Sequence, residues 1–111
     1  MKLNEYQEEE ASRTEIFSYE LPEFLSVGQV YTVLGQAGES GEIEEKLKKA
    51  IREDDEEYIE EMRDEVGDVL WYLSQVCEEF GWDMGEVAED NIAKLQDRQE
   101  RGKLTGKGDK R

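Results

Sequence analysis

Two pairs of acidic residues share one spacing: Glu39 with Glu42, and Glu65 with Asp68. If both segments are helical, the members of each pair lie about one turn apart on the same side of their helix. Carboxylates held close together repel one another unless cations bind between them. A site built from oxygen ligands alone suits Mg²⁺ or Mn²⁺. Antiparallel packing of the two segments would therefore bring four ligands to one metal site.

The spacing by itself is weak evidence, because 30 of the 111 residues are acidic and helix surfaces are often charged. The position of the pairs beside the apolar residues is more informative. On each helix, the first glutamate lies at the edge of an apolar stripe, and the second acid lies roughly 60° farther from that stripe on the same flank. The stripes are Ile43, Leu47, Ala50 and Ile51 in one segment, and Met62, Val66, Val69, Leu73, Val76 and Phe80 in the other.

Histidine is absent from the sequence, which excludes a Glu-x-x-His di-iron bundle and disfavours a zinc hydrolase. Glycines accompany both acid pairs: Gly35, Gly38 and Gly41 surround the first, and Gly67 lies within the second. A glycine inside a helix costs roughly 0.5–1 kcal/mol relative to alanine. We expect these glycines to let another helix, a metal or a phosphate approach the backbone closely.

The elements that position the acids are predicted to be helices. A first helix spans about 4–18, with Asn4 as its N-cap. Pro22 then interrupts the pattern because it lacks a backbone N–H. A second helix spans about 23–53, and the glycines at 35–41 are expected to bend or break it.

The third helix is predicted over about 56–80, and Asp83 is the predicted N-cap of a fourth helix that ends near Arg101. Four helices with short connections favour an all-α fold, a mostly antiparallel four-helix bundle. Residues 1–102 are expected to form a single domain. The glycine-rich, basic segment 103–111 is expected to be a flexible tail.

Composition narrows the classes of function. The net charge of −16 argues against binding to nucleic-acid backbones or anionic membranes, and an anionic substrate would need a cation to mediate its approach. Cys77 is the single cysteine, which suits a reducing compartment. No apolar run approaches the ~18 residues of a membrane span, and no signal peptide is seen. These features predict a cytoplasmic protein.

Three stretches of the sequence resemble a known family. They read GQAGESGEIEEKLKKAIR from residue 35, DEVGDVLWYL from residue 64 and NIAKLQDR from residue 91. Together they are similar to the MazG-like all-α nucleoside triphosphate pyrophosphohydrolases, whose signature is E-x-x-E, a spacer and E-x-x-D. The resemblance covers about residues 4–102, as in the short, single-domain members.

The resemblance implies that Glu39, Glu42, Glu65 and Asp68 bind Mg²⁺, with Mn²⁺ as an alternative, and that the metal holds a nucleoside triphosphate. In the family, water attacks the α-phosphorus and yields a nucleoside monophosphate and pyrophosphate, which suits a role in housekeeping of nucleotide pools. Glu39 and Glu42 are then the candidate catalytic residues. Glu42 is a candidate general base, although the sequence does not separate a base from a ligand.

Six further residues are candidate substrate contacts. Lys46 and Lys49 lie on the carboxylate flank and could reach phosphates, although ordinary pairing of Lys46 with Glu42 is an equal alternative. Tyr72, one turn after Asp68, could contact the base or could simply pack in the helix seam. On the fourth helix, the predicted contacts are Asn91 with the nucleotide, and Lys94 and Arg98 with phosphate.

Trp71 points away from the apolar stripe and is a candidate subunit contact, because related proteins form homodimers or homotetramers of helical bundles. An alternative from another class is an acidic helical binding protein that mimics DNA and has no catalytic activity. Such a protein would spread its important acids over an outer surface and would need no metal. A third alternative is a scaffold bundle whose ancestral site is inactive, and the intact acids at all four signature positions count against it.

Overall fold

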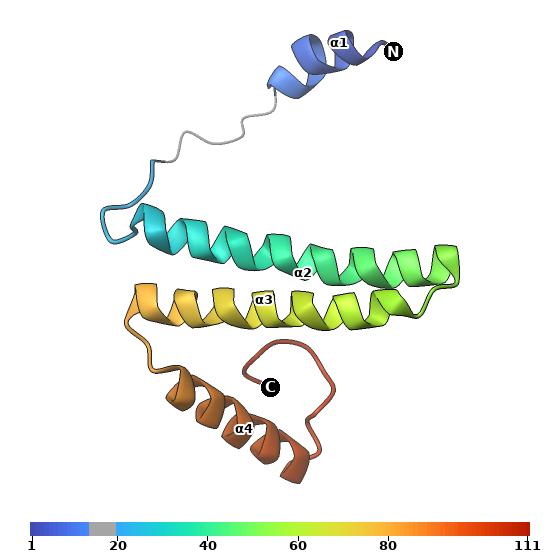
Figure 1. Cartoon of the computed structure of the whole chain (residues 1–111). Helices are drawn as coiled ribbons and strands as arrows, with labels where there is room; N and C mark the ends of the chain where they lie inside the picture. Colours follow the sequence, from blue (N-terminus) through green and yellow to red (C-terminus); the bar gives the residue numbers. More distant parts are fainter. Residues whose placement is uncertain (14–19) are drawn as a thin grey trace.

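The computed structural model describes residues 1–13 and 20–111, and this part of the chain is helical with no strand. The predicted all-α fold is confirmed. Helices α2 (Val27–Glu53) and α3 (Glu57–Phe80) lie side by side and run antiparallel (Figure 1). Helix α4 (Met84–Glu100) follows a short connection and points away from this pair. Among the three long helices, α2 and α3 therefore pack antiparallel along their length and form a hairpin, which α4 does not join.

Helix α2 begins four residues later than predicted and is not broken by its glycines. The Ser26 hydroxyl accepts a hydrogen bond from the Gln29 amide at 3.1 Å, and the Ser26 amide donates to the Gln29 side chain at 2.8 Å. This reciprocal capping box satisfies two backbone groups at the helix start. Between Pro22 and Leu25 the chain forms a turn instead, closed by a 3.0 Å backbone hydrogen bond.

The turn between α2 and α3 consists of residues 54–56. Asp54 adopts a left-handed conformation with φ 50°, which ends α2, and its amide donates to the Ala50 carbonyl. The Asp55 carboxylate accepts from the Glu57 amide at 3.0 Å and so supports the start of α3. Because the turn is short, it fixes how the residues of one helix lie opposite those of the other.

The ends of α3 and α4 agree with the sequence prediction. Gly81, with φ 70°, follows the last residue of α3, a conformation that glycine adopts without steric cost. The Asp83 carboxylate accepts from the Glu86 amide at 2.9 Å, which confirms Asp83 as the N-cap of α4. Trp82, which lies in the connection between these helices, stacks on Phe80 with ring centroids 4.8 Å apart.

The first helical segment differs from its prediction. Helix α1 (Leu3–Glu5) continues into a π turn and a 3₁₀ turn that end at Arg13. Asn4 lies within α1 and is not its cap; the Lys2 amide instead donates to the Glu5 carboxylate at 3.1 Å. Residues 14–18 of the predicted helix lie outside the described residues.

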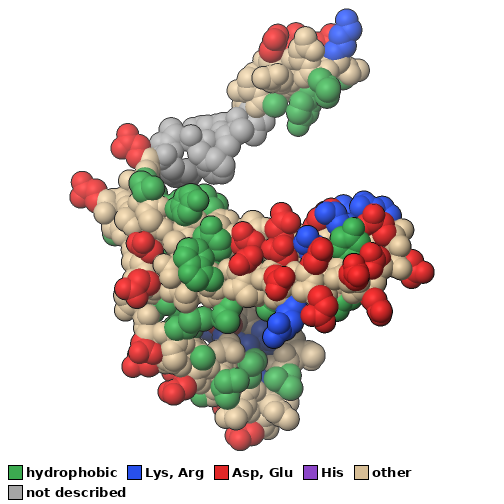
Figure 2. All heavy atoms as spheres, viewed as in Figure 1, with side chains coloured by type: hydrophobic (Ala, Val, Ile, Leu, Met, Phe, Trp, Pro, Cys, Tyr) green, Lys and Arg blue, Asp and Glu red, His purple; other side chains and the backbone are tan. Residues whose placement is uncertain are grey.

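Very little of the described chain is buried. Cys77, Thr32 and Arg98 are the buried residues among those described, while leucines, valines and aromatic residues on all three long helices keep much of their surface exposed. Figure 2 shows acidic side chains over the half of the hairpin near the turn, and hydrophobic ones over the other half and α4. No described helix has both the length and the apolar character needed to cross a membrane. The hairpin therefore has a seam rather than a closed core.

Candidate metal centre

Three of the four predicted metal ligands meet in the seam of the hairpin. One carboxylate oxygen from each of Glu39, Glu65 and Asp68 lies within 4.8 Å of the other two. Glu39 comes from α2, and the other two residues lie one turn apart on α3. Glu39 and Glu65 are half-buried, whereas Asp68 is exposed. The site is thus open to solvent on one side, as a site that receives a ligand must be.

The electrostatics of this trio are those of a site that lacks positive charge. Loss of hydration raises the pKa of Glu39 above its usual range, and the negative charges of Asp68 and Glu65 raise it further. Three acidic oxygens in this arrangement favour either a shared proton or a bound cation. The all-oxygen donor set fits Mg²⁺ or Mn²⁺ and does not resemble a structural zinc site.

Glu42, the fourth predicted ligand, lies outside the trio. It is exposed on α2, and its charge has the smallest effect among the groups that raise the pKa of Glu39. Its charge also acts on Lys46. Glu42 is therefore close enough to influence the site electrostatically, while its carboxylate is not gathered with the other three.

Tyr72 and Gly35 form one end of the site. Tyr72 is half-buried, and a Cβ placed on Gly35 would lie 2.1 Å from the Tyr72 ring, so the ring packs directly on the α2 backbone. Burial raises the pKa of Tyr72, and the neighbouring Tyr31 and the charges of Glu39 and Asp68 add to this effect. The ring is thus both a seam residue and a neighbour of the carboxylates.

We expect Gly35→Ala to destabilise the protein by about 1–3 kcal/mol, because the added methyl group overlaps the Tyr72 ring. Gly38→Ala is the matched control on the same helix, since no atom lies within 4 Å of its added methyl group. That change should stabilise the helix by about 0.5–1 kcal/mol. Urea unfolding of both variants measures the difference, and equal effects would show that Gly35 has no packing role.

The other glycines do not serve packing within the described chain. Like Gly38, Gly41 and Gly67 have nothing within 4 Å of an added Cβ. Close approach by a neighbouring helix therefore explains Gly35 alone among the four glycines of the acid segments. Approach of a metal or a phosphate at the other three glycines stays a prediction.

The two predicted lysines of α2 have acidic partners. Lys46 pairs with Glu61 of α3, with 3.2 Å between the Nζ and Oε2 atoms, rather than with Glu42. The hydrogen bond to Glu61 raises the pKa of Lys46, and the charges of Glu61, Glu65 and Glu42 act in the same direction. Lys49 lies 3.9 Å from Glu45 on its own helix. Lys46 is therefore the predicted cation that borders the acidic trio.

The predicted contacts on α4 are not gathered with the trio. Asn91 is exposed at the edge of a mainly apolar cavity of about 390 Å³ between α3 and α4. Lys94 and Arg98 both pair with Asp109 of the segment 103–111, at 2.9 and 3.3 Å. In this structure these cations therefore have a carboxylate partner within the same chain.

Two residues that border the site were not predicted from the sequence. They are Glu61, the partner of Lys46, and Tyr31, the neighbour of Tyr72. A signal for Glu61 exists in the sequence. Glu61, Glu65, Asp68 and Tyr72 follow one another at four-, three- and four-residue intervals, which places them along one side of α3.

Comparison with known proteins shows the family to which the chain belongs. Residues 31–102 match the MazG nucleotide pyrophosphohydrolase domain, and this range contains both acid pairs and every predicted substrate contact. The chain belongs to the MazG family. This confirms the family resemblance seen in the sequence, and it makes the acid trio between α2 and α3 the natural candidate for the metal centre of a MazG domain.

The chain is also similar to the Gene 37 protein of Mycobacterium phage L5. The two are 40% identical over 88 residues, which cover 76% of this chain and 77% of the phage protein. No solved structure matches the MazG chain significantly. The match to the MazG domain leaves out α1 and the segment 103–111.

Proposed function

We propose that the protein hydrolyses nucleoside triphosphates at the α-phosphorus, releasing a nucleoside monophosphate and pyrophosphate in an Mg²⁺-dependent reaction. The observation that carries this proposal is the meeting of Glu39, Glu65 and Asp68 within 4.8 Å in a MazG domain. A chain of net charge −16 repels a triphosphate. Binding of the substrate therefore requires a cation that contacts both the protein carboxylates and the triphosphate.

Glu39, Glu65 and Asp68 would hold the metal, for which Mg²⁺ is proposed and Mn²⁺ is an alternative. A bound divalent ion would offset the charge of the triphosphate and of the leaving pyrophosphate. Glu42 stands outside the trio and is the candidate base that removes a proton from the attacking water. The new bond joins the water oxygen to the α-phosphorus, and the bond from that phosphorus to the pyrophosphate oxygen breaks.

The remaining predicted contacts fall into two groups. Lys46 borders the trio, and we propose that it breaks its ion pair with Glu61 and binds the phosphates of the substrate instead. Lys49 is a weaker candidate because it pairs with Glu45 on its own helix. Tyr72 offers a half-buried aromatic ring beside the carboxylates for contact with the base. On α4, Asn91, Lys94 and Arg98 are proposed to reach the substrate.

The proposal is tested with a panel of ribo- and deoxyribonucleoside triphosphates in Mg²⁺ and in EDTA. The expected products are monophosphate and pyrophosphate, resolved by chromatography, with no turnover in EDTA. In ¹⁸O-labelled water the label should enter the monophosphate, because the water attacks the α-phosphorus. Release of orthophosphate and a diphosphate would contradict the proposed site of attack. Absence of hydrolysis across the panel would contradict the enzyme itself.

We expect millimolar Mg²⁺ to raise the melting temperature relative to EDTA at equal ionic strength. A cation that binds the folded state adds stability in proportion to its occupancy and also relieves the repulsion within the trio. The Glu39→Gln variant should lose most of this response. Identical melting curves of the parent protein in Mg²⁺ and in EDTA would argue against a preformed site.

We further propose that the protein is a homo-oligomer in which a second copy covers the open faces of the helices. The accessible surface is 9609 Å², whereas about 6,300 Å² is expected for a compact protein of this size. The excess, about 3,300 Å² per chain, is more than the roughly 1,000–2,500 Å² that each partner contributes to an obligate interface. Both a homodimer and a homotetramer would reduce this excess.

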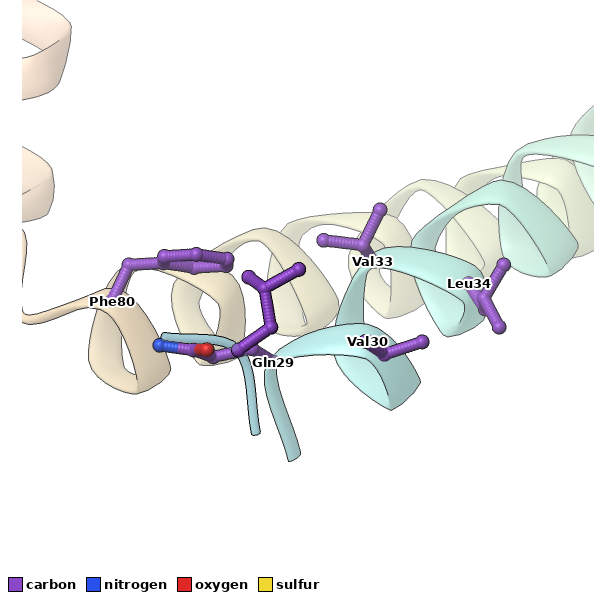
Figure 3. A pocket seen from close by; sticks show the side chains of 6 residues that line it. Gln29, Val30, Val33, Leu34 and Phe80 are labelled. Carbon is purple, nitrogen blue, oxygen red and sulfur yellow. The ribbon is translucent and has the colours of Figure 1, made fainter. Parts of the chain in front are cut away.

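The exposed apolar residues indicate where a second copy would pack. On α3, Val66, Leu70 and Leu73 form a stripe that we call the open stripe, and Leu70 is 57% exposed. Trp71, 56% exposed, is the subunit contact expected from the sequence. Where α2 begins and α3 ends, the side chains of Figure 3 line an apolar pocket of about 270 Å³ between Phe80 and Val33. A solvated surface of this character is typical of an interface.

A further inference from the structure

The segment 103–111 places a carboxylate on the two cations of α4. Asp109 Oδ1 accepts from Lys94 Nζ at 2.9 Å and from Arg98 Nη2 at 3.3 Å. The Arg98 guanidinium also donates to the backbone carbonyl of Asp109. As a result, Arg98 is only 4% exposed although it lies on an otherwise open helix. Both cations lower the pKa of Asp109, as expected for a carboxylate held by positive charge.

The segment is held in this position by further hydrogen bonds. The Lys103 amide donates to the Arg98 carbonyl at 2.6 Å, and Arg101 donates to the Arg111 carbonyl at 2.9 Å. The Arg111 guanidinium donates to the carbonyls of Leu104 and Gly108. These contacts curl the segment into the loop that lies between α3 and α4 in Figure 1. Specific contacts around Asp109 therefore hold the loop in this arrangement.

We propose that Asp109 occupies the place of a substrate phosphate, so that the segment 103–111 acts as a competitive internal inhibitor of triphosphate binding. This inference rests on the proposed function, in which Lys94 and Arg98 bind phosphate. A carboxylate and a phosphate oxygen present the same kind of acceptor to a guanidinium or ammonium group. The same two donors therefore bind either Asp109 or the substrate, but not both at full strength.

The strength of the inhibition follows from the exposure of Asp109. Its side chain is 77% exposed, so water screens its pairs with the two cations and the contact is modest. A triphosphate carries more negative charge and displaces it. The apparent affinity for the triphosphate equals the intrinsic affinity multiplied by the fraction of molecules in which the two cations are free. We expect this fraction to correspond to about a 3- to 10-fold effect.

The test is Asp109→Asn, which keeps the side-chain shape and removes the competing charge. The KM for the triphosphate should fall about 3- to 10-fold while kcat stays within a factor of two. Glu89→Gln is the control, because it removes one negative charge from an exposed position on α4 and should leave KM unchanged. Equal effects of the two variants would overturn the proposal, since they would reveal only a change in net charge.

Binding of inorganic tripolyphosphate, measured by calorimetry in Mg²⁺, separates this proposal from the enzymatic one. Asp109→Asn should bind it about 3- to 10-fold more tightly, and Lys94→Ala in the same background should abolish the gain. If no nucleotide is hydrolysed but this gain is found, the closed anion site stands and the proposed enzyme falls. If hydrolysis is found but neither KM nor tripolyphosphate affinity changes, the internal inhibitor is refuted. Circular dichroism verifies that each variant is folded.

Discussion

Glu39→Gln and Asp68→Asn are each expected to reduce pyrophosphate release at least ~10²-fold, the scale for loss of one electrostatic contact to the transition state. Each change keeps the shape of the side chain and removes one charge from the trio. Folding stability in EDTA should stay level or rise, because the trio is a cluster of like charges and its neighbours raise the pKa of Glu39. Steady-state kinetics in Mg²⁺ and thermal melts in EDTA measure the two effects.

Glu44→Gln is the matched control, because it removes an exposed charge from α2 outside the trio. We expect its activity to remain within a factor of two. A purely structural role for the trio predicts the reverse pattern, with activity kept and stability lost. A DNA mimic predicts little change in either quantity, since one charge among 30 acids hardly alters a long-range field. Full activity in both trio variants would refute the site.

The same assay assigns Glu42. If Glu42 acts as a base, Glu42→Gln loses turnover but keeps the Mg²⁺-dependent rise in melting temperature. If it is a fourth ligand, both are lost. The arrangement favours the first outcome, because the Glu42 carboxylate is not among the oxygens that lie within 4.8 Å of one another.

Leu70→Glu is expected to convert the assembled protein to monomers and to lower its melting temperature by more than 10 °C. In an isolated chain, a leucine that is 57% exposed should accept a charge at a cost within about 0.5 kcal/mol. If a second copy covers the open stripe, the same change buries an unpaired charge in an apolar interface. Sedimentation velocity reports the assembly state, and calorimetry reports the melting temperature.

Leu104→Glu makes the same substitution at a leucine that is 48% exposed and lies outside the helices. It should leave both the assembly state and the melting temperature unchanged. If Leu70→Glu also changes neither, the open stripe is an ordinary solvent-exposed face and the second copy does not bind there. A parent protein that sediments as a monomer would contradict the homo-oligomer directly.

Much of the helical pattern could be predicted from the sequence because local signals determine it. Gly81 and Asp83 mark the end of α3 and the start of α4 through backbone conformation and side-chain capping, and both act within a few residues. Helix α2 starts at Val27 rather than directly after Pro22, because Pro22 is not the boundary of the helix. The stronger signal was the pair Ser26 and Gln29, which satisfies two backbone groups and so decides the first turn.

The packing of the helices could be predicted only in part. Antiparallel pairing of α2 and α3 follows from a short turn and matching apolar stripes. The position of α4 depends on contacts beyond its own sequence. Leu70 and the other residues of the open stripe are exposed in this chain. The apolar pattern of a helix therefore shows which of its faces must be covered, but it does not show which helix covers that face.

The candidate site shows the same division. Helical periodicity placed Glu39, Glu65 and Asp68 beside the seam, and the structure brings them together. Helical periodicity could not separate Glu42 from the other three acids. The angular position of a residue around its own helix does not show how far along the neighbouring helix it lies. The pairing of Arg98 with Asp109 was also beyond reach. It depends on a loop whose glycines, at 102, 106 and 108, have positive φ values.

The turn at residues 54–56 restricts how proteins of this lineage can change length. One extra helical turn inserted into α2 after Glu42 would slide Glu39 about 5.4 Å along α3. That displacement exceeds the 4.8 Å that now encloses the three oxygens. Equal insertions into α2 and α3, or extra residues within the turn itself, would leave the acids level. Insertions and deletions among relatives should therefore occur as matched pairs in the two helices or inside the loop, and unpaired ones should mark members in which the three acids no longer meet.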